Sequence, residues 1–176
     1  EVLAAHGTLH ALVNNAGIAG HDYSTITDSD TETWQAILGA NLMGPMFFIR
    51  AVGKHMQAQG GGAIVNTASV AGIRSGAGGN AYSASKAAVR NLVRSWAHDL
   101  RGTGMRVNVM SPGPTQTDKL MELLPPEALN EIKRTVPLER LGAPKETAGA
   151  VAFLASDDSS FMTGSEVFVD GGYAQV

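Results

Sequence analysis

The sequence contains no cysteine, which excludes disulfides, thiolate metal sites and cysteine nucleophiles. It also has no excess of basic residues, because 13 lysines and arginines stand against 16 aspartates and glutamates, a net charge of −3. This mild acidity argues against a protein that binds nucleic acid through a basic face. Long apolar runs are missing too. The longest, Leu42 to Ile49, is interrupted by Gly44 and Pro45 and falls far below the roughly 20 residues that span a bilayer. We therefore expect neither nucleic acid nor a membrane as a partner.

Glycine is plentiful, with 21 among 176 residues, and apolar residues make up 44% of the chain. An apolar share of this size is typical of an ordinary globular core. The length suits one domain or a large part of one. Because the sequence begins at Glu1 rather than at a methionine, we expect residues 1–176 to form a single partial domain. With no secretory signal in the sequence, we expect a cytoplasmic protein.

Short β-rich runs alternate with longer helical patterns, which is typical of a doubly wound α/β protein with a parallel sheet. The strands are predicted within residues 9–14, 63–67, 106–110 and 166–169. The helices are predicted over 31–59, 82–101 and 145–154, and residues 118–135 are predicted as a polar, mobile excursion that is helical in patches. Such alternation calls for right-handed crossovers and for helices on both faces of the sheet. Ligands in such sheets bind beyond the carboxyl ends of the strands.

The residues that follow each predicted strand are polar or rich in glycine, where a purely structural protein needs only a turn. They are Asn14 to Gly17, Thr67 to Ser69, and Ser111 to Thr117. Because the carboxyl ends of parallel strands share one edge of the sheet, we expect a binding site there.

Tyr82 and Lys86 stand four residues apart, so both lie on one face if the segment is helical. A free tyrosine ionises near pH ~10, and a neighbouring cation stabilises the phenolate. The pair therefore suits proton exchange with a substrate oxygen. By itself this spacing is common on solvated helices, so a surface pair is the alternative. Ser69 precedes Tyr82 by thirteen residues at the end of a strand, where its hydroxyl can face the same cleft.

Taken together, these segments resemble the short-chain dehydrogenase/reductase family. The matches are Asn14-Asn-Ala-Gly17, Asn41, Ser69, Tyr82-x-x-x-Lys86, Pro112-Gly-Pro-Thr-Gln-Thr117 and Val169-Asp-Gly-Gly172. The resemblance implies a Rossmann-like, three-layer α/β/α fold. It also implies an oxidoreductase that transfers a hydride between NAD or NADP and a small-molecule carbonyl or alcohol. The family's first strand, glycine-rich loop and helix do not occur in the sequence. We therefore expect an amino-terminally truncated domain that lacks the first βαβ unit.

The resemblance further implies a role for each matching residue. Tyr82 would be the general acid/base, and Lys86 would lower the pKa of Tyr82 and hold the nicotinamide ribose. Ser69 would donate to the same substrate oxygen. Asn41 would anchor a water that links Lys86 to solvent. The expected cofactor-binding residues are Asn14, Ala16 and Gly17 on the adenosine side, and Pro112, Gly113, Thr115 and Thr117 around the nicotinamide.

Several alternatives stay open from the sequence. The chain is either this enzyme or a truncated, non-catalytic α/β module that no longer binds dinucleotide, and Thr115 and Thr117 are either cofactor ligands or loop caps. The run Gly76-Ala-Gly78-Gly-Asn-Ala81 matches G-x-G-x-x-A, but it leads into the Tyr82 helix, so we interpret it as a flexible loop. The histidines show no ligand spacing, so no metal is expected. Neither the choice between NAD and NADP nor the substrate is determined. Specificity is expected in residues 18–23, 71–79 and 118–140.

The two long predicted helices resemble those that form the four-helix contact of tetrameric family members. We therefore expect a homotetramer, with Met46, Phe47, Val93 and Trp96 as apolar contacts. Pro45 lies inside the first helical pattern and lacks the N–H that would bond the Asn41 carbonyl. We predict a local break over 41–45 that leaves this carbonyl open to a water.

Overall fold

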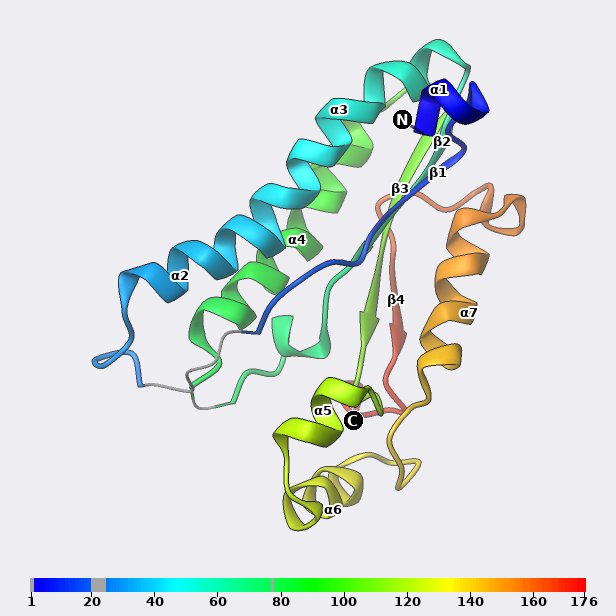
Figure 1. Cartoon of the computed structure of the whole chain (residues 1–176). Helices are drawn as coiled ribbons and strands as arrows, with labels where there is room; N and C mark the ends of the chain where they lie inside the picture. The colour runs from blue at the N-terminus through cyan, green and yellow to red at the C-terminus, as the bar shows by residue number, and fades with distance from the viewer. Residues whose placement is uncertain (1, 20–24, 77) are drawn as a thin grey trace.

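The computed structural model describes residues 2–19, 25–76 and 78–176. Within these ranges, parallel strands form one sheet and follow each other across it in chain order (Figure 1). The strands are β1 (Ala11–Asn14), β2 (Gly62–Thr67), β3 (Met105–Pro112) and β4 (Glu166–Val169). The predicted parallel sheet is confirmed.

Helices cover both faces of the sheet, as a doubly wound fold requires (Figure 1). One side carries α2 (Thr31–Leu38), a π-helical turn (Gly39–Met43), α3 (Gly44–Ala58) and α4 (Asn80–Asp99). The other side carries α7 (Pro144–Ala155). The remaining helices are α1 (Val2–His6), α5 (Asp118–Leu123) and α6 (Pro126–Thr135), with short 3-10 turns at Val70–Gly72 and Asp157–Ser159. The predicted excursion over 118–135 therefore folds as two short helices.

The third crossover differs in hand from the first two. Every crossover steps to the next strand in the same direction across the sheet. The first two pass through α3 and α4 on one face, whereas the third passes through α7 on the opposite face. For parallel strands that advance in one direction, moving the connecting helix to the other face reverses the hand. The prediction that all crossovers are right-handed is therefore wrong. The physical reason is that α7 covers a second apolar face.

Alternate residues of the central strands pack into two separate hydrophobic cores, one on each face of the sheet. Ile64 packs with Val93 beneath α3 and α4, whereas Val65 and Met110 pack with Leu154 of α7. Because successive strand residues point to opposite faces, each strand contributes to both layers. The sheet is thus held from both sides, which gives the loops at its carboxyl edge a rigid frame.

A row of buried asparagines crosses the sheet beneath this edge. Asn14 Nδ2 donates to Asn66 Oδ1 at 2.8 Å, and Asn66 Nδ2 donates to the Asn108 carbonyl at 3.5 Å. Asn108 then binds the segment before β4, donating to the Met162 carbonyl and accepting from the Ser165 N–H. Since a buried amide without partners is costly, these bonds favour a single register of the strands.

The segment predicted as one helix over 31–59 is divided by the π-helical turn Gly39–Met43. Pro45 lies in the first turn of α3 and is buried. A proline removes one backbone donor, and π turns of this kind occur frequently at functional sites. The helix nevertheless continues from Thr31 to Ala58, so the predicted break over 41–45 is present only as a π-helical irregularity at Gly39–Met43, which contains Asn41. The open state of the Asn41 carbonyl stays a prediction.

Two large apolar side chains near the start of α3 are exposed. Phe47 and Phe48 are 54% and 59% exposed. By length and composition alone, Thr31–Ala58 is the one segment among the described residues that could cross a membrane, a test that core helices of soluble proteins also pass. Val93 is 0% exposed, so the expectation that it forms a subunit contact is wrong. Its side chain faces the sheet, and the apolar surface belongs instead to α3.

Candidate active site

Three loops extend from the carboxyl ends of neighbouring strands and meet at one edge of the sheet. They are residues 15–19 after β1, 68–76 with 78–79 after β2, and 113–117 after β3. Helix α4 begins beside them and runs along the sheet (Figure 1). The sequence predicted a site at this edge, and the structure brings the candidate residues there on these loops and on α4.

Lys86 is the buried cation of the site. Its side chain projects from α4 and Nζ donates to the Thr67 carbonyl at 2.8 Å, at the end of β2. The residue is only 5% exposed, and burial lowers the pKa of Lys86 to about 8. An ammonium has three N–H groups, and the bond to Thr67 uses one of them. The ammonium can therefore also donate to a ligand at this edge.

Tyr82 lies one helical turn before Lys86, in the first turn of α4. Lys86 Nζ is 5.7 Å from the centroid of the Tyr82 ring, so the predicted pair shares one face of the helix. Ser85 Oγ donates to the Tyr82 carbonyl at 2.7 Å. The geometry brings a phenol and a positive charge together, as proton exchange requires.

Ser69 follows β2 and caps the 3-10 turn Val70–Gly72. Its Oγ accepts a bond from the Ala71 N–H at 3.1 Å, and the residue is buried. Because Oγ is an acceptor in this bond, the hydroxyl proton is left to be donated. The structure thus holds a hydrogen-bond donor on the loop that borders Tyr82 and Lys86.

Asn41 is buried in the π-helical turn, and its side chain binds the loop after β1. Oδ1 accepts from the Ile18 N–H and Nδ2 donates to the Ile18 carbonyl, both at 2.8 Å. Nδ2 also donates to Ser85 Oγ at 3.1 Å. The side chain therefore joins the loop after β1 to α4.

Gly17 packs against this arrangement. A Cβ at residue 17 would lie 3.0 Å from Asn41 Oδ1, which would have to shift slightly, and 3.5 Å from Lys86 Nζ, which is an ordinary contact distance. Asn14, predicted on the adenosine side, directs its side chain to Asn66 instead. Ala16 is exposed on the loop. The bond to Asn66 therefore turns the Asn14 amide toward β2 rather than toward the loop after β1.

The segment after β3 is shaped by close packing and local bonds. A Cβ at Gly113 would lie 2.6 Å from the Asp170 Cα, so only glycine fits after Pro112. Thr115 Oγ1 donates to the Gly113 carbonyl, and Thr117 Oγ1 accepts from the Leu120 N–H at the start of α5. Thr117 thus caps α5, whereas Thr115 makes only a local bond within the segment, which borders the site on its β3 side.

Comparisons with known proteins agree with this geometry. A family model described as enoyl-(acyl carrier protein) reductase matches residues 1–174. A 3-oxoacyl-(acyl-carrier-protein) reductase of Thermotoga maritima is 38% identical over 172 residues, which cover 98% of this chain and 69% of the relative. A 3-alpha-(or 20-beta)-hydroxysteroid dehydrogenase of Mycobacterium tuberculosis is 42% identical over 170 residues, which cover 97% and 62%. This chain belongs to the short-chain dehydrogenase/reductase family.

Solved structures of the family have the same fold. A gluconate 5-dehydrogenase of Burkholderia cenocepacia, in complex with NADP and tartrate, is similar with a TM-score of 0.93 at 33% identity, covering 99% of this chain and 68% of that chain. A 7 alpha-hydroxysteroid dehydrogenase complexed with NADH has a TM-score of 0.91 at 32% identity, covering 99% and 67%. The chain is therefore an oxidoreductase of the short-chain dehydrogenase/reductase family that acts on CH–OH or C=O groups with a nicotinamide dinucleotide.

The residues of the site fit such a cofactor. The loop after β1 stays close to Lys86 because Gly17 has no side chain. The Lys86 ammonium can donate beyond its bond to Thr67, to hydroxyl oxygens such as those of a ribose. Of the predicted specificity regions, residues 20–23 and 77 lie outside the described residues.

Sequence reasoning missed two residues that hold the site together. Ser85 lies inside the Tyr-x-x-x-Lys motif and joins Asn41 to the Tyr82 carbonyl. Arg90 lies one turn beyond Lys86 and binds the turn that Ser69 caps. Their helical spacing from Tyr82 and Lys86 was the available signal, because residues three or four apart share a helix face.

Proposed function

We propose that this enzyme reduces a ketone or aldehyde to an alcohol, and catalyses the reverse oxidation, with Tyr82 as the proton donor and acceptor. The observation that carries this proposal is the buried Lys86 ammonium beside the Tyr82 ring, with one N–H bonded to Thr67. A positive charge at this place favours the phenolate that remains once Tyr82 has given up its proton.

Each site residue then has a defined task during carbonyl reduction. The nicotinamide, when bound, supplies the hydride to the carbonyl carbon. Tyr82 gives its hydroxyl proton to the carbonyl oxygen, and Ser69 donates a hydrogen bond to the same oxygen as negative charge develops on it. Lys86 holds the ribose hydroxyls through its ammonium group. In the oxidation direction the same proton returns to Tyr82.

The polar segments around the site would hold the cofactor. We assign the adenosine side to the backbone of Asn14, Ala16 and Gly17. The nicotinamide side falls to Pro112, Gly113, Thr115 and Thr117, which follow β3 at the same edge. The water expected between Lys86 and solvent would bind the Asn41 carbonyl.

The substrate class we propose is a secondary alcohol and its ketone. Named relatives include a 3-oxoacyl reductase, a hydroxysteroid dehydrogenase and a cis-4-hydroxycyclohexanecarboxylate dehydrogenase of Sinomonas cyclohexanicum, 40% identical. Each of these names denotes a hydroxyl or oxo carbon. The matching family model is described by an enoyl reduction, which makes a carbon–carbon double bond the second candidate. The relatives' names favour the first, whereas a Ser69 donor suits the carbonyl oxygen of either substrate.

We further propose that the complete enzyme is a homotetramer. The support is the exposure of two large apolar side chains of α3, Phe47 and Phe48. Apolar surface of this kind on a soluble protein marks an interaction site. Met46 and Trp96 are half-buried beside this surface and would contribute at its margin.

Replacement of the proposed acid tests the function. We expect Tyr82→Phe to lower kcat by at least about a hundredfold, the lower end for a general acid or base. The dissociation constants of NAD and NADP should not change, since the ring is retained. Steady-state assays with both cofactors, on cyclic ketones, 3-oxoacyl thioesters and enoyl thioesters, separate the two substrate candidates. Wild-type turnover by Tyr82→Phe, with hydride transfer limiting the rate, would contradict the proposal.

A further inference from the structure

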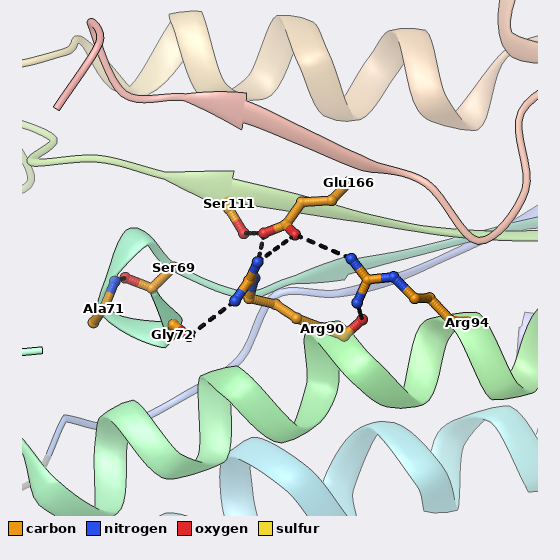
Figure 2. A network of polar contacts seen from close by, with 7 residues as sticks. All are labelled: Ser69, Ala71, Gly72, Arg90, Arg94, Ser111 and Glu166. Atoms are coloured by element: carbon orange, nitrogen blue, oxygen red, sulfur yellow. Dashed lines mark hydrogen bonds and ion pairs between the residues drawn. The ribbon is translucent and has the colours of Figure 1, made fainter. Parts of the chain in front are cut away.

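A largely buried ion pair joins α4, the helix that carries Tyr82 and Lys86, to β4 (Figure 2). Arg90 of α4 donates from Nε and Nη2 to the two carboxylate oxygens of Glu166 in β4, at 2.5 and 2.8 Å. The side chains are 18% and 7% exposed. A bidentate pair of this kind fixes the plane of the guanidinium as well as its position. The remaining nitrogen, Nη1, is thereby aimed in one direction.

Nη1 donates to the Gly72 carbonyl at 2.9 Å. Gly72 ends the turn that Ser69 caps, and its N–H donates to the Ser69 carbonyl. The turn also rests directly on α4, because a Cβ at Gly72 would lie 2.9 Å from Arg90 Cδ and 3.0 Å from the Ala87 nitrogen. Arg90 therefore connects the turn that Ser69 caps to α4 through a hydrogen bond.

The same carboxylate reaches a third element of the site. Ser111 Oγ donates to Glu166 Oε1 at 2.7 Å, just before Pro112 and Gly113 in the chain (Figure 2). Arg90 itself stands two turns after Tyr82 on α4. The network thus links the helix of Tyr82, the turn of Ser69 and the end of β3.

We propose that Arg90 is a positioning residue for the reaction. Its bond to Gly72 sets the distance between the Ser69 hydroxyl and the Tyr82 hydroxyl, and Glu166 holds the guanidinium in the orientation that makes this bond. The inference rests on the proposed function, in which both hydroxyls act on one substrate oxygen. A displacement of about 1 Å in such a geometry lowers rates by up to about a hundredfold.

The alternative is that Arg90 has a purely structural role and only neutralises the charge of Glu166. The double variant Arg90→Met/Glu166→Gln separates the two roles, because it removes both charges and leaves no unpaired ion. The amide oxygen introduced by the second substitution still accepts from Ser111, but Gly72 loses its donor. We expect a free energy of unfolding close to that of the wild type, an unchanged dissociation constant for the cofactor, and a kcat about ten- to a hundredfold lower. If the double variant has both the kcat and the free energy of unfolding of the wild type, the proposal is wrong.

Arg90→Lys provides a variant that keeps the charge. One ammonium lacks the planar fork that bonds Glu166 and Gly72 together, so we expect a folded enzyme with a lowered kcat. In a Ser69→Ala background the same change should cost little more, since Arg90 acts through Ser69. If Arg90→Lys lowers kcat by the same factor with and without Ser69→Ala, the proposal is wrong.

Arg94→Met is the matched control. Arg94 Nη2 lies 3.9 Å from the same carboxylate, but its side chain is 54% exposed and its Nη1 donates to the Arg90 carbonyl rather than to the Ser69 turn. We expect unchanged kinetics, and a loss equal to that of Arg90→Lys would show that charge alone matters and overturn the proposal. Tyr82→Phe reports on the proposed function separately. If it is inactive while the Arg90 variants match the wild type, only the positioning role fails.

Discussion

Lys86 combines burial with a positive charge, and this makes the stability of the apoprotein depend on pH. Burial lowers the pKa of Lys86 from its ordinary 10.5 to about 8. The unfolded chain therefore holds this proton over a pH range in which the folded chain has released it. Stability rises with pH wherever the unfolded state binds more protons, so the folded state gains stability between about pH 8 and pH 10.5.

We expect Lys86→Met to remove this dependence. Relative to the variant, the wild-type apoprotein should gain up to about 3 kcal/mol of unfolding free energy as the pH rises from 7 to 10.5. Urea denaturation of both proteins at several pH values measures the difference, in which groups common to both cancel. If the free energy of unfolding changes with pH in the same way in both proteins, burial does not destabilise the Lys86 ammonium.

Gly17 has no room for a side chain next to two site residues. We expect Gly17→Ala to cost about 1 kcal/mol of stability and to lower kcat, because the new methyl group lies 3.0 Å from Asn41 Oδ1 and the amide must shift. Gly149→Ala in α7 is the control, since a Cβ there meets nothing within 4 Å and alanine favours a helix. Equal effects of the two substitutions on kcat would contradict this account.

At the scale of elements, the π-helical turn between α2 and α3 presents Asn41 to the loop after β1. Pro45 cannot donate to the Asn41 carbonyl, and Pro45→Ala supplies that N–H. We expect this variant to draw residues 41–45 into a regular α-helix, with unchanged or higher thermal stability and a lower kcat. Thermal unfolding and steady-state kinetics measure the two effects. Pro144→Ala, at the start of α7, is the control and should leave kcat unchanged.

At the scale of the whole molecule, the surface around Phe47 and Phe48 of α3 is the one that we expect to be covered in the assembly. Phe47→Lys/Phe48→Lys places two charges in this apolar patch and should dissociate the proposed tetramer. Light scattering at micromolar concentration measures the mass. Leu123→Lys, an exposed apolar position on α5, should leave the assembly intact. A tetramer that survives the double substitution would place the contact elsewhere.

The sequence by itself determined the strands, the long helices and the family. Alternating β-rich and helical patterns located every strand of the described sheet, because binary patterning depends on local periodicity. The Tyr82–Lys86 pair was also readable, since a spacing of four brings two side chains to one helix face. Pro45 indicated an irregularity in the helix over 31–59, because the missing N–H is a property of the residue alone.

Only the tertiary structure decided the features that depend on distant neighbours. The hand of the third crossover follows from which sheet face α7 must cover, and the burial of Val93 follows from how α4 sits on the sheet. Asn14 belongs to a buried amide row because Asn66 lies opposite it in the register. Arg90 and Glu166 are 76 residues apart in the sequence, so no local pattern could pair them. Burial, register and long-range pairing are set by packing, and for that reason they were not readable from the sequence.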